Sequence, residues 1–259
     1  MAWLPMTHKE IAALSDGLSV EEQVGILEQD LRAHCDLIRD LLAERDAASH
    51  AEILAFSLLD SLGYLLMPDK IKGGGQRIRG FIECLASCED CTRFSVPALL
   101  SLLRASEDTS FQALQNRCQE LFDLHWDPGS LPRIQMDLSE SEVLELTGGR
   151  GNLQVVLKSG VLIELGQCKH SRMLAEKRNA LAHQLVKKGL RSVANVSEPH
   201  YIWRASDDAY NDDVNGNNDD NGNKRTDPDD WELVYPVKFL LNLCEDGILA
   251  ACSHLREKK

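Results

Sequence analysis

The chain has 259 residues, of which 43% are hydrophobic and 27% are charged, a composition typical of a globular protein with a sizeable core. No run of about 18 apolar residues occurs, which excludes a membrane-spanning helix. The formal net charge of −13 argues against a general coating of nucleic acid, although it leaves room for a small, localised phosphate site.

The first ten residues and the cysteines predict where the protein resides. Met1 to Glu10 contains no basic region leading into an apolar run, so we expect no signal peptide. Without secretory features, the eight cysteines predict reduced thiols in the cytoplasm. We expect no membrane association.

Helical patterns fill the first half of the chain. Ser19 to Arg45 has apolar residues at helical spacing, and Ser19 with Glu22 predicts a capping box at its start. The next segment, 51–66, is almost wholly apolar and predicts a buried helix. After a break at Pro68 and the triple glycine 73–75, further helices are expected at 76–87, 97–104 and 111–124.

The second half mixes short strands with two helices. After Pro128-Gly129, the apolar runs 153–157 and 161–165 flank Lys158-Ser159-Gly160, which predicts a β-hairpin. A helix is expected at about 169–188, because Gly189 follows two lysines at its end. Strands are expected at 201–203 and 231–235, and a closing amphipathic helix at 236–256.

A segment rich in Asn, Asp and Gly lies between those two strands. Residues 207–230 hold nine acidic residues against two basic ones, Lys224 and Arg225. Such a composition buries too little apolar surface to fold, so we expect an acidic disordered loop.

The most informative motif is Arg178-Asn179-Ala180-Leu181-Ala182-His183, which lies in the helix expected at 169–188. An imidazole can move protons near neutral pH, and a guanidinium can hold an oxyanion. Around the motif lies the most basic part of the chain, with a single acid, Glu176. The basic residues of this segment are Lys169, Arg172, Lys177, Arg178, Lys187, Lys188 and Arg191.

The spacing R-x4-H alone is weak evidence, since Arg45 and His50 repeat it. The later copy has a more suggestive setting. Arg178 lies in the middle of a stripe formed by Leu174, Leu181 and Leu185, where a charge is costly unless it is paired or faces a polar site. The alternative is that Arg178 is a snorkelling interface residue and His183 an ordinary surface histidine.

At Arg178, Asn179 and His183 the chain resembles the HEPN superfamily, whose ribonuclease members carry an R-x4-6-H signature, often with a polar residue directly after the arginine. The resemblance covers roughly 150 residues of helix. It implies a mostly α, HEPN-like helical bundle with small inserted β-hairpins. We therefore expect a single HEPN-like domain over residues 1–259, with a β-containing insertion at 128–166 and the acidic loop at 207–230.

The resemblance also implies a function: a metal-independent endoribonuclease, such as a toxin of a toxin–antitoxin pair or an anti-phage defence protein. Arg178, Asn179 and His183 would be catalytic, and Arg172, Lys177, Lys187 and Lys188 would bind RNA. No cofactor or metal is needed. The expected partners are a second copy in a homodimer, RNA as substrate, and an antitoxin or regulatory protein. The alternative is a non-catalytic HEPN-like module that binds RNA, a nucleotide or a protein.

Two other clusters have structural alternatives. Cys84, Cys88 and Cys91 have the spacing of an iron–sulfur motif, but they also suit one buried helix face, so we expect neither metal nor disulfide; a zinc site would need a fourth ligand. The second cluster lies around the triple glycine and predicts either a phosphate site at a helix start or a solvated surface. It consists of Lys70, Lys72, Arg77 and Arg79.

Overall fold

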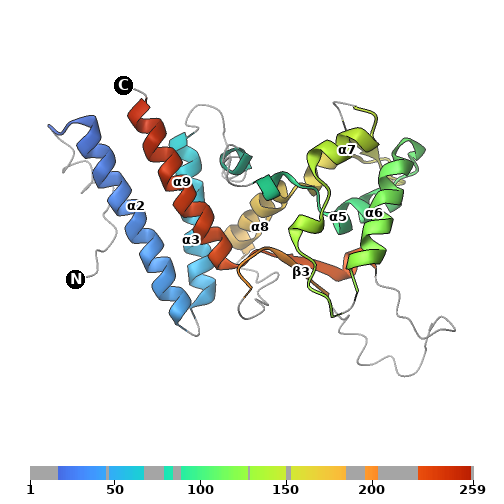
Figure 1. The fold of residues 1–259 in the computed structure, drawn as a ribbon, viewed down its shortest axis with the longest axis horizontal. Coiled ribbons are helices and arrows are strands. Elements are labelled where there is room, and N and C mark those ends of the chain that lie inside the picture. The colour runs from blue at the N-terminus through green and yellow to red at the C-terminus, as the bar shows by residue number, and fades with distance from the viewer. Residues whose placement is uncertain are drawn as a thin grey trace. The chain divides into compact units, whose positions relative to one another are not determined.

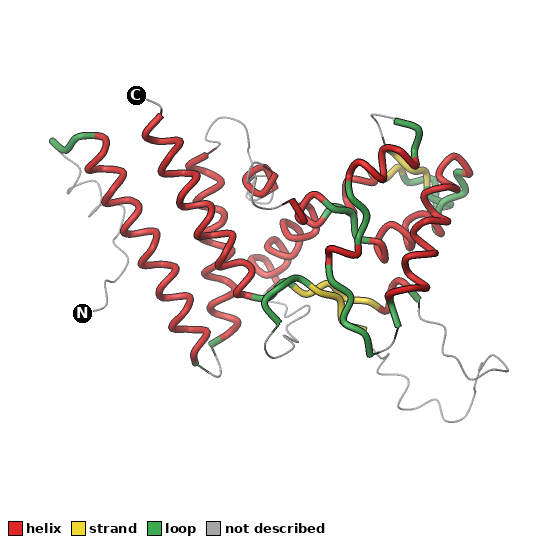
Figure 2. The backbone as a smooth tube through the Cα atoms, viewed as in Figure 1, coloured by secondary structure: helices red, strands yellow, loops and turns green. Residues whose placement is uncertain are grey.

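The structure is a computed structural model that describes residues 17–44, 47–66, 79–83, 89–127, 129–149, 153–184, 196–203 and 227–257. These described residues are mostly helical and contain two small antiparallel strand pairs, which confirms the predicted mostly α class with small β elements (Figure 2).

The chain divides into two compact units. Unit 1 comprises residues 1–91, 174–198 and 235–259, and unit 2 comprises residues 92–173 and 199–234. Compact units of this kind are either two domains or two lobes of one domain. The single domain expected over residues 1–259 therefore stays a prediction, as does the insertion at 128–166.

Unit 1 is built on three long helices that pack against one another: α2 (Val20–Ala43), α3 (Ala48–Leu66) and α9 (Val237–Glu257) (Figure 1). Residues 79–83 are helical, and α8 (His170–Gln184) enters this unit at Leu174. The predicted start of α2 is confirmed, because the Ser19 hydroxyl accepts from the Glu22 N–H while the Glu22 carboxylate accepts from the Ser19 N–H.

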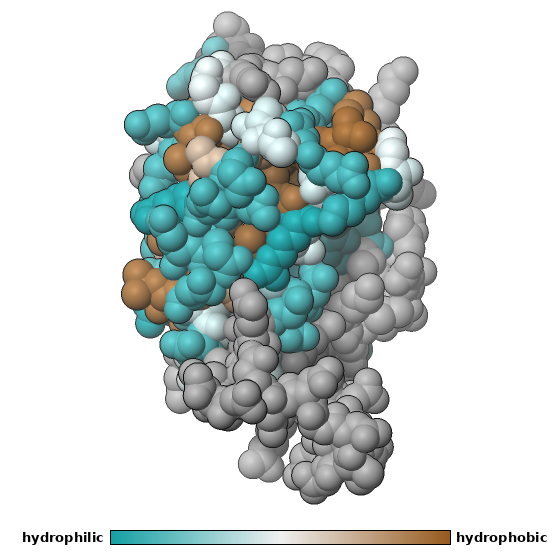
Figure 3. All heavy atoms as spheres, turned by 90° about the vertical axis from the view of Figure 1, so that its right-hand side faces the viewer, coloured by the Kyte–Doolittle hydropathy of each residue, from teal (hydrophilic) through white to brown (hydrophobic). Residues whose placement is uncertain are grey.

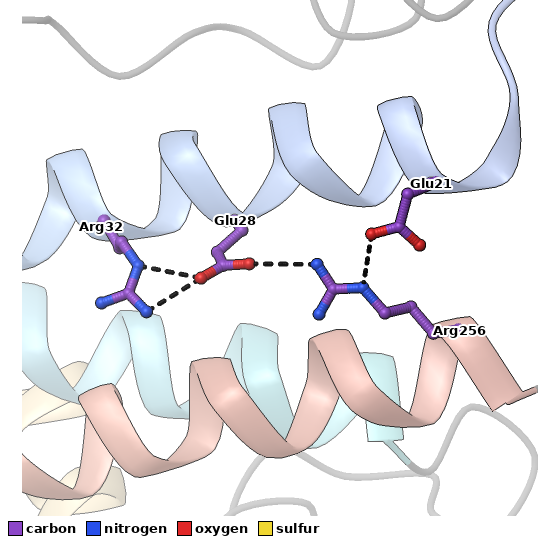
Figure 4. Close-up of polar contacts among 4 residues, drawn as sticks. All are labelled: Glu21, Glu28, Arg32 and Arg256. Atoms are coloured by element: carbon purple, nitrogen blue, oxygen red, sulfur yellow. Dashed lines mark hydrogen bonds and ion pairs between the residues drawn. The ribbon is translucent and has the colours of Figure 1, made fainter.

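Charged side chains join the N-terminal half of α2 to the C-terminal end of α9. Arg256 Nε donates to Glu21 at 3.0 Å and its Nη2 donates to Glu28 at 3.4 Å, while Arg32 donates to the other oxygen of Glu28 at 2.8 Å (Figure 4). The hydrogen bond from Arg32 is the main cause that lowers the pKa of Glu28. These side chains are partly solvated, so the network contributes little to stability.

At Gly247, α9 packs closely against Phe81 and Leu62. A Cβ atom at this position would lie 2.2 Å from Cζ and 2.8 Å from Cε2 of Phe81, and 3.1 Å from Cδ1 of Leu62. Both neighbours are fully buried, so neither can move aside into solvent. The close approach of residues 79–83 to α9 therefore requires glycine.

We expect Gly247→Ala to destabilise unit 1. Alanine improves helix propensity by about 1 kcal/mol, but overpacking a filled core costs about 1–3 kcal/mol, and the overlap with Phe81 is severe. Thermal unfolding followed by circular dichroism measures the effect. The control is Gly25→Ala in α2, where a Cβ meets nothing within 4 Å and stability should rise. Equal melting temperatures for the two variants would show that the Phe81 contact is not limiting.

Unit 2 contains shorter elements. Its α-helices are α5 (Val96–Arg104), α6 (Gln112–His125) and α7 (Glu140–Leu146), together with the first turn of α8. The first strand pair is β1 (Gln154–Val156) with β2 (Leu162–Glu164), and the second is β3 (His200–Trp203) with β4 (Trp231–Val234). Short 3-10 helices lie at Thr109–Phe111, Ile134–Met136, Leu165–Cys168 and Pro228–Asp230, and a further one, Glu89–Thr92, begins in unit 1 and ends with the first residue of unit 2.

The core of unit 2 draws on nearly all of these elements. Trp126 stacks on Phe122, one turn earlier, and meets the ring of Tyr201 edge-on at 5.5 Å between centroids. Leu99, Leu100 and many other side chains around them are fully buried. The face drawn in Figure 3 is mainly hydrophilic, with its hydrophobic residues in separate small groups.

The predicted strands and the hairpin are confirmed. Val155 pairs with Ile163 across the hairpin, and Gly160 in the connecting turn has a φ of +80°, a conformation that favours glycine. In the second pair, Tyr201 lies opposite Leu233. The sequence pattern missed α7, a helix of only two turns.

Two expectations need correction. The acidic loop predicted at 207–230 is ordered at its end, where Asp227 caps the 3-10 helix Pro228–Asp230; residues 204–226 lie outside the described residues. Cys91 is buried and disulfide-bonded, so the expectation of reduced thiols is wrong for this residue. We expected Cys84, Cys88 and Cys91 to share one face of a continuous α-helix and to form no disulfide. This expectation failed at Cys91, because Glu89–Thr92 is a 3-10 helix. The positions 84–88 lie outside the described residues.

Candidate functional site

The motif lies in α8, as predicted. Arg178, Asn179 and His183 all belong to this helix, and the side chains are described as far as Asn179. Leu174, the first residue of the predicted apolar stripe, is fully buried. The side chain of His183 and the whole of Lys187 and Lys188 lie outside the described residues.

Arg178 is paired with an acid from α3. Its Nη2 donates to Oδ2 of Asp60 at 2.9 Å, and its Nη1 donates to Oδ1 of Asn179 at 3.2 Å. The side chains of Arg178 and Asp60 are 21% and 20% exposed, so the pair is largely shielded but reachable from solvent. The charge in the apolar stripe thus has its partner within unit 1. The charge therefore needs no second protomer to be paired, and the homodimer stays a prediction.

Lys177, the neighbouring cation, is held more deeply. Its Nζ lies 3.2 Å from Oε1 of Glu52, and the two side chains are 12% and 2% exposed. The ammonium also lies 5.8 Å from the ring centroid of Tyr235, which adds a cation–π contact. A buried carboxylate needs a cation nearby, so this pair explains why Glu52 is tolerated on the buried side of α3.

The other basic residues of α8 differ in their surroundings. In unit 2, Lys169 Nζ donates to Glu140 at 2.7 Å and lies over the ring of Phe94. Arg172 is half-buried. Lys169, Lys177 and Arg178 are therefore each neutralised by an acid of the same chain, and the basic character expected from the sequence is reduced on the described part of the segment.

The remaining sequence candidates are separate from this helix. His50, of the second R-x4-H copy, is exposed on α3, and Arg45 lies outside the described residues. Of the basic cluster near the triple glycine, Arg79 is described and pairs with Glu83 at 2.9 Å. Among the described residues no group of three or more His, Cys, Asp or Glu is placed to hold a metal ion.

Unit 2 contains a constellation that sequence reasoning missed. Oδ1 of Asp137 accepts from the backbone N–H of Val96 at 2.7 Å. Its Oδ2 accepts from the hydroxyl of Tyr201 at 2.6 Å and lies 2.8 Å from Nε2 of His170. The main-chain oxygen of Asp137 accepts from Arg93 at 2.9 Å. No spacing signal announces this group, because its members are 33 and 64 residues apart.

Although acid, imidazole and hydroxyl are catalytic residue types, this group is closed to a substrate. The side chains of Asp137 and His170 are 0% exposed, and Tyr201 is 1% exposed. The carboxylate instead joins the start of α5, the start of α8 and strand β3. The role of the group is therefore structural: it links three elements of unit 2 through buried hydrogen bonds.

Three of the described free thiols, those of Cys35, Cys118 and Cys244, are poor nucleophiles. Burial raises the pKa of Cys118 to about 12 and that of Cys35 to about 11, and it raises the pKa of Cys244 as well. These thiols are protonated at neutral pH, whereas the thiolate is the reactive form. Thiol chemistry is thus disfavoured at these positions, and α8 remains the candidate site.

No family model, curated protein or solved structure matches this chain. The HEPN resemblance stays a prediction based on the motif. Within the described parts of the chain, the helices are all too short or too polar to cross a membrane.

Proposed function

We propose that this protein is a metal-independent endoribonuclease of HEPN type, with its site on α8. The observation that carries the proposal is the geometry of Arg178, which is held by Asp60 at 2.9 Å yet keeps 21% of its side chain exposed. A guanidinium has five N–H donors, and the contacts with Asp60 and Asn179 use one each. An arginine oriented in this way can still bind a phosphate oxygen.

In this mechanism the three motif residues divide the work. His183 acts as general acid or base towards the ribose 2′-hydroxyl or the leaving oxygen, and Arg178 stabilises the charge of the phosphorane-like state. Asn179 orients the imidazole. Arg172, Lys187 and Lys188 contact the RNA backbone, whereas Lys177, which was expected among them, is paired with Glu52 and only 12% exposed, and so does not take part. The product carries a 2′,3′-cyclic phosphate.

The proposed biological setting is a toxin or anti-phage defence protein that acts in the cytoplasm as a homodimer, under control of an antitoxin or regulatory protein. This setting follows from family analogy. The second candidate is a non-catalytic HEPN-like module that binds RNA, a nucleotide or a protein. The ion pairs of Lys169, Lys177 and Arg178 leave less positive charge for an RNA backbone, which favours the nucleotide or protein ligand of this second candidate.

Cleavage of RNA in EDTA separates the two candidates. We expect the purified protein to cut mixed RNA with EDTA present and to leave 2′,3′-cyclic phosphate ends, detectable by mass spectrometry. Arg178→Lys keeps the charge but loses the planar fork, so the rate should fall roughly 10²-fold. Arg32→Lys makes the same change in another ion-paired helical arginine and should leave the rate unchanged. Loss of the parent's cleavage in EDTA would move the binding module ahead.

A further inference from the structure

We infer that Asp60 of α3 is a positioning residue for RNA cleavage, acting through the guanidinium of Arg178. This inference rests on the proposed ribonuclease function. Asp60 is 118 residues away from Arg178 in the chain, and its Oδ2 accepts from Nη2 of Arg178 at 2.9 Å. The contact restrains one edge of the guanidinium, while Asn179 restrains Nη1 from the same helix.

The two ion pairs between α3 and α8 suit different tasks. Glu52 and Asp60 are eight residues apart in α3, a separation of about 12 Å along the helix axis. The adjacent cations Lys177 and Arg178 of α8 therefore pair with acids at two separate places along α3. The Glu52–Lys177 pair is closed, with side chains 2% and 12% exposed. The Asp60–Arg178 pair keeps about a fifth of each side chain in solvent. Only the second pair of these two can meet a phosphate without unpacking the helices.

The second oxygen of Asp60 supports a restraining role. Its Oδ1 is inaccessible to solvent and has no hydrogen-bond partner in the described part of the chain. A carboxylate oxygen in that position loses its hydration without a replacement, which is unfavourable for folding. The carboxylate offsets this cost only through its pairing with Arg178, which is the same contact that orients the guanidinium.

Removal of the carboxylate has opposite effects on catalysis and on binding. Without Asp60, the guanidinium samples more rotamers and is less often placed against the reacting phosphate. Small misplacements of catalytic groups lower rates by up to about 10²-fold. The local charge becomes one unit more positive at the same time, so a polyanion should bind at least as well as before. A residue with a purely structural role would weaken both properties.

The experiment compares Asp60→Asn with the parent in the full chain. Cleavage of a fluorescein-labelled RNA 12-mer in EDTA gives kcat and KM. Binding of the DNA 12-mer of the same sequence, which lacks the attacking 2′-hydroxyl, is followed by anisotropy. We expect kcat to fall about 10-fold to 10²-fold, with DNA affinity unchanged or tighter. The control, Asp36→Asn on α2, makes the same change where the side chain is 71% exposed, and should alter neither value.

Two further variants protect the interpretation. Asp60→Glu keeps the charge, so its kcat should lie between those of Asp60→Asn and the parent. If Asp60→Asn does not fold, Asp60→Glu still tests whether a displaced carboxylate lowers kcat. In an Arg178→Ala background, Asp60→Asn should cause no further loss of kcat, because the cation through which Asp60 acts is absent. A further multiplicative loss in that background overturns the inference.

The failure of this inference differs from the failure of the function. If Asp60→Asn retains the parent kcat while His183→Ala is inactive, the protein is a ribonuclease and Asp60 has no positioning role. If the parent does not cleave, or if His183→Ala cleaves as fast as the parent, the function itself is wrong and the inference falls with it.

Discussion

Substitution of His183 by alanine is expected to lower RNA cleavage by about 10²–10⁴-fold, the usual contribution of general acid–base catalysis. In the proposed mechanism the imidazole moves the proton between the ribose hydroxyl and solvent, and alanine cannot replace it. Single-turnover rates in EDTA, with enzyme in excess over a labelled RNA, measure the chemical step. Because α8 also carries Arg178, circular dichroism must show that the variant keeps the helix content of the parent.

The second R-x4-H copy supplies the matched control for this variant. His50 lies exposed on α3, so His50→Ala removes an imidazole from the same unit without touching the candidate site. Its cleavage rate should equal that of the parent. If His183→Ala matches the parent as well, proton transfer by His183 is not part of the mechanism.

Substitution of Asp137 by alanine is expected to lower the free energy of unfolding of unit 2 by about 3–5 kcal/mol. The carboxylate is 0% exposed and satisfies the Val96 N–H, the Tyr201 hydroxyl and His170. Its loss leaves all three groups buried without this partner, and domains are stable by only about 5–15 kcal/mol in total. The variant is therefore close to unfolding.

Tryptophan fluorescence during urea unfolding suits this measurement, because Trp126, Trp203 and Trp231 all lie in unit 2. The control is Tyr201→Phe, which removes one hydrogen bond and keeps the ring packed on Trp126; it should cost about 1 kcal/mol. A shift of the midpoint for Asp137→Ala no larger than that for Tyr201→Phe would show that water or neighbouring groups replace the carboxylate.

Local signals in the sequence predicted most of the individual elements. Ser19 and Glu22 identified the start of α2, because a capping box involves only residues three apart. Gly160 identified the hairpin turn, because its positive φ is a property of one residue. The segment Glu89–Thr92 was misread, since an i, i+4, i+7 spacing of cysteines does not require a continuous helix.

The candidate site was predictable only in part. Arg178, Asn179 and His183 were found from spacing and from the basic setting, and their common helix is confirmed. The need of Arg178 for a partner also followed from the sequence, because a charge in an apolar stripe requires one. The identity of that partner did not follow, since several acids lie on the predicted helices.

By itself, then, the sequence determined most of the long helices, the strand segments and the motif, all of which depend on residues within a few turns of one another. Only the tertiary structure decided that Asp60 and Glu52 pair with Arg178 and Lys177, and that Asp137 joins Val96, His170 and Tyr201. Contacts across 33 to 125 residues depend on how helices cross and rotate, which packing of the whole core sets and no local pattern encodes.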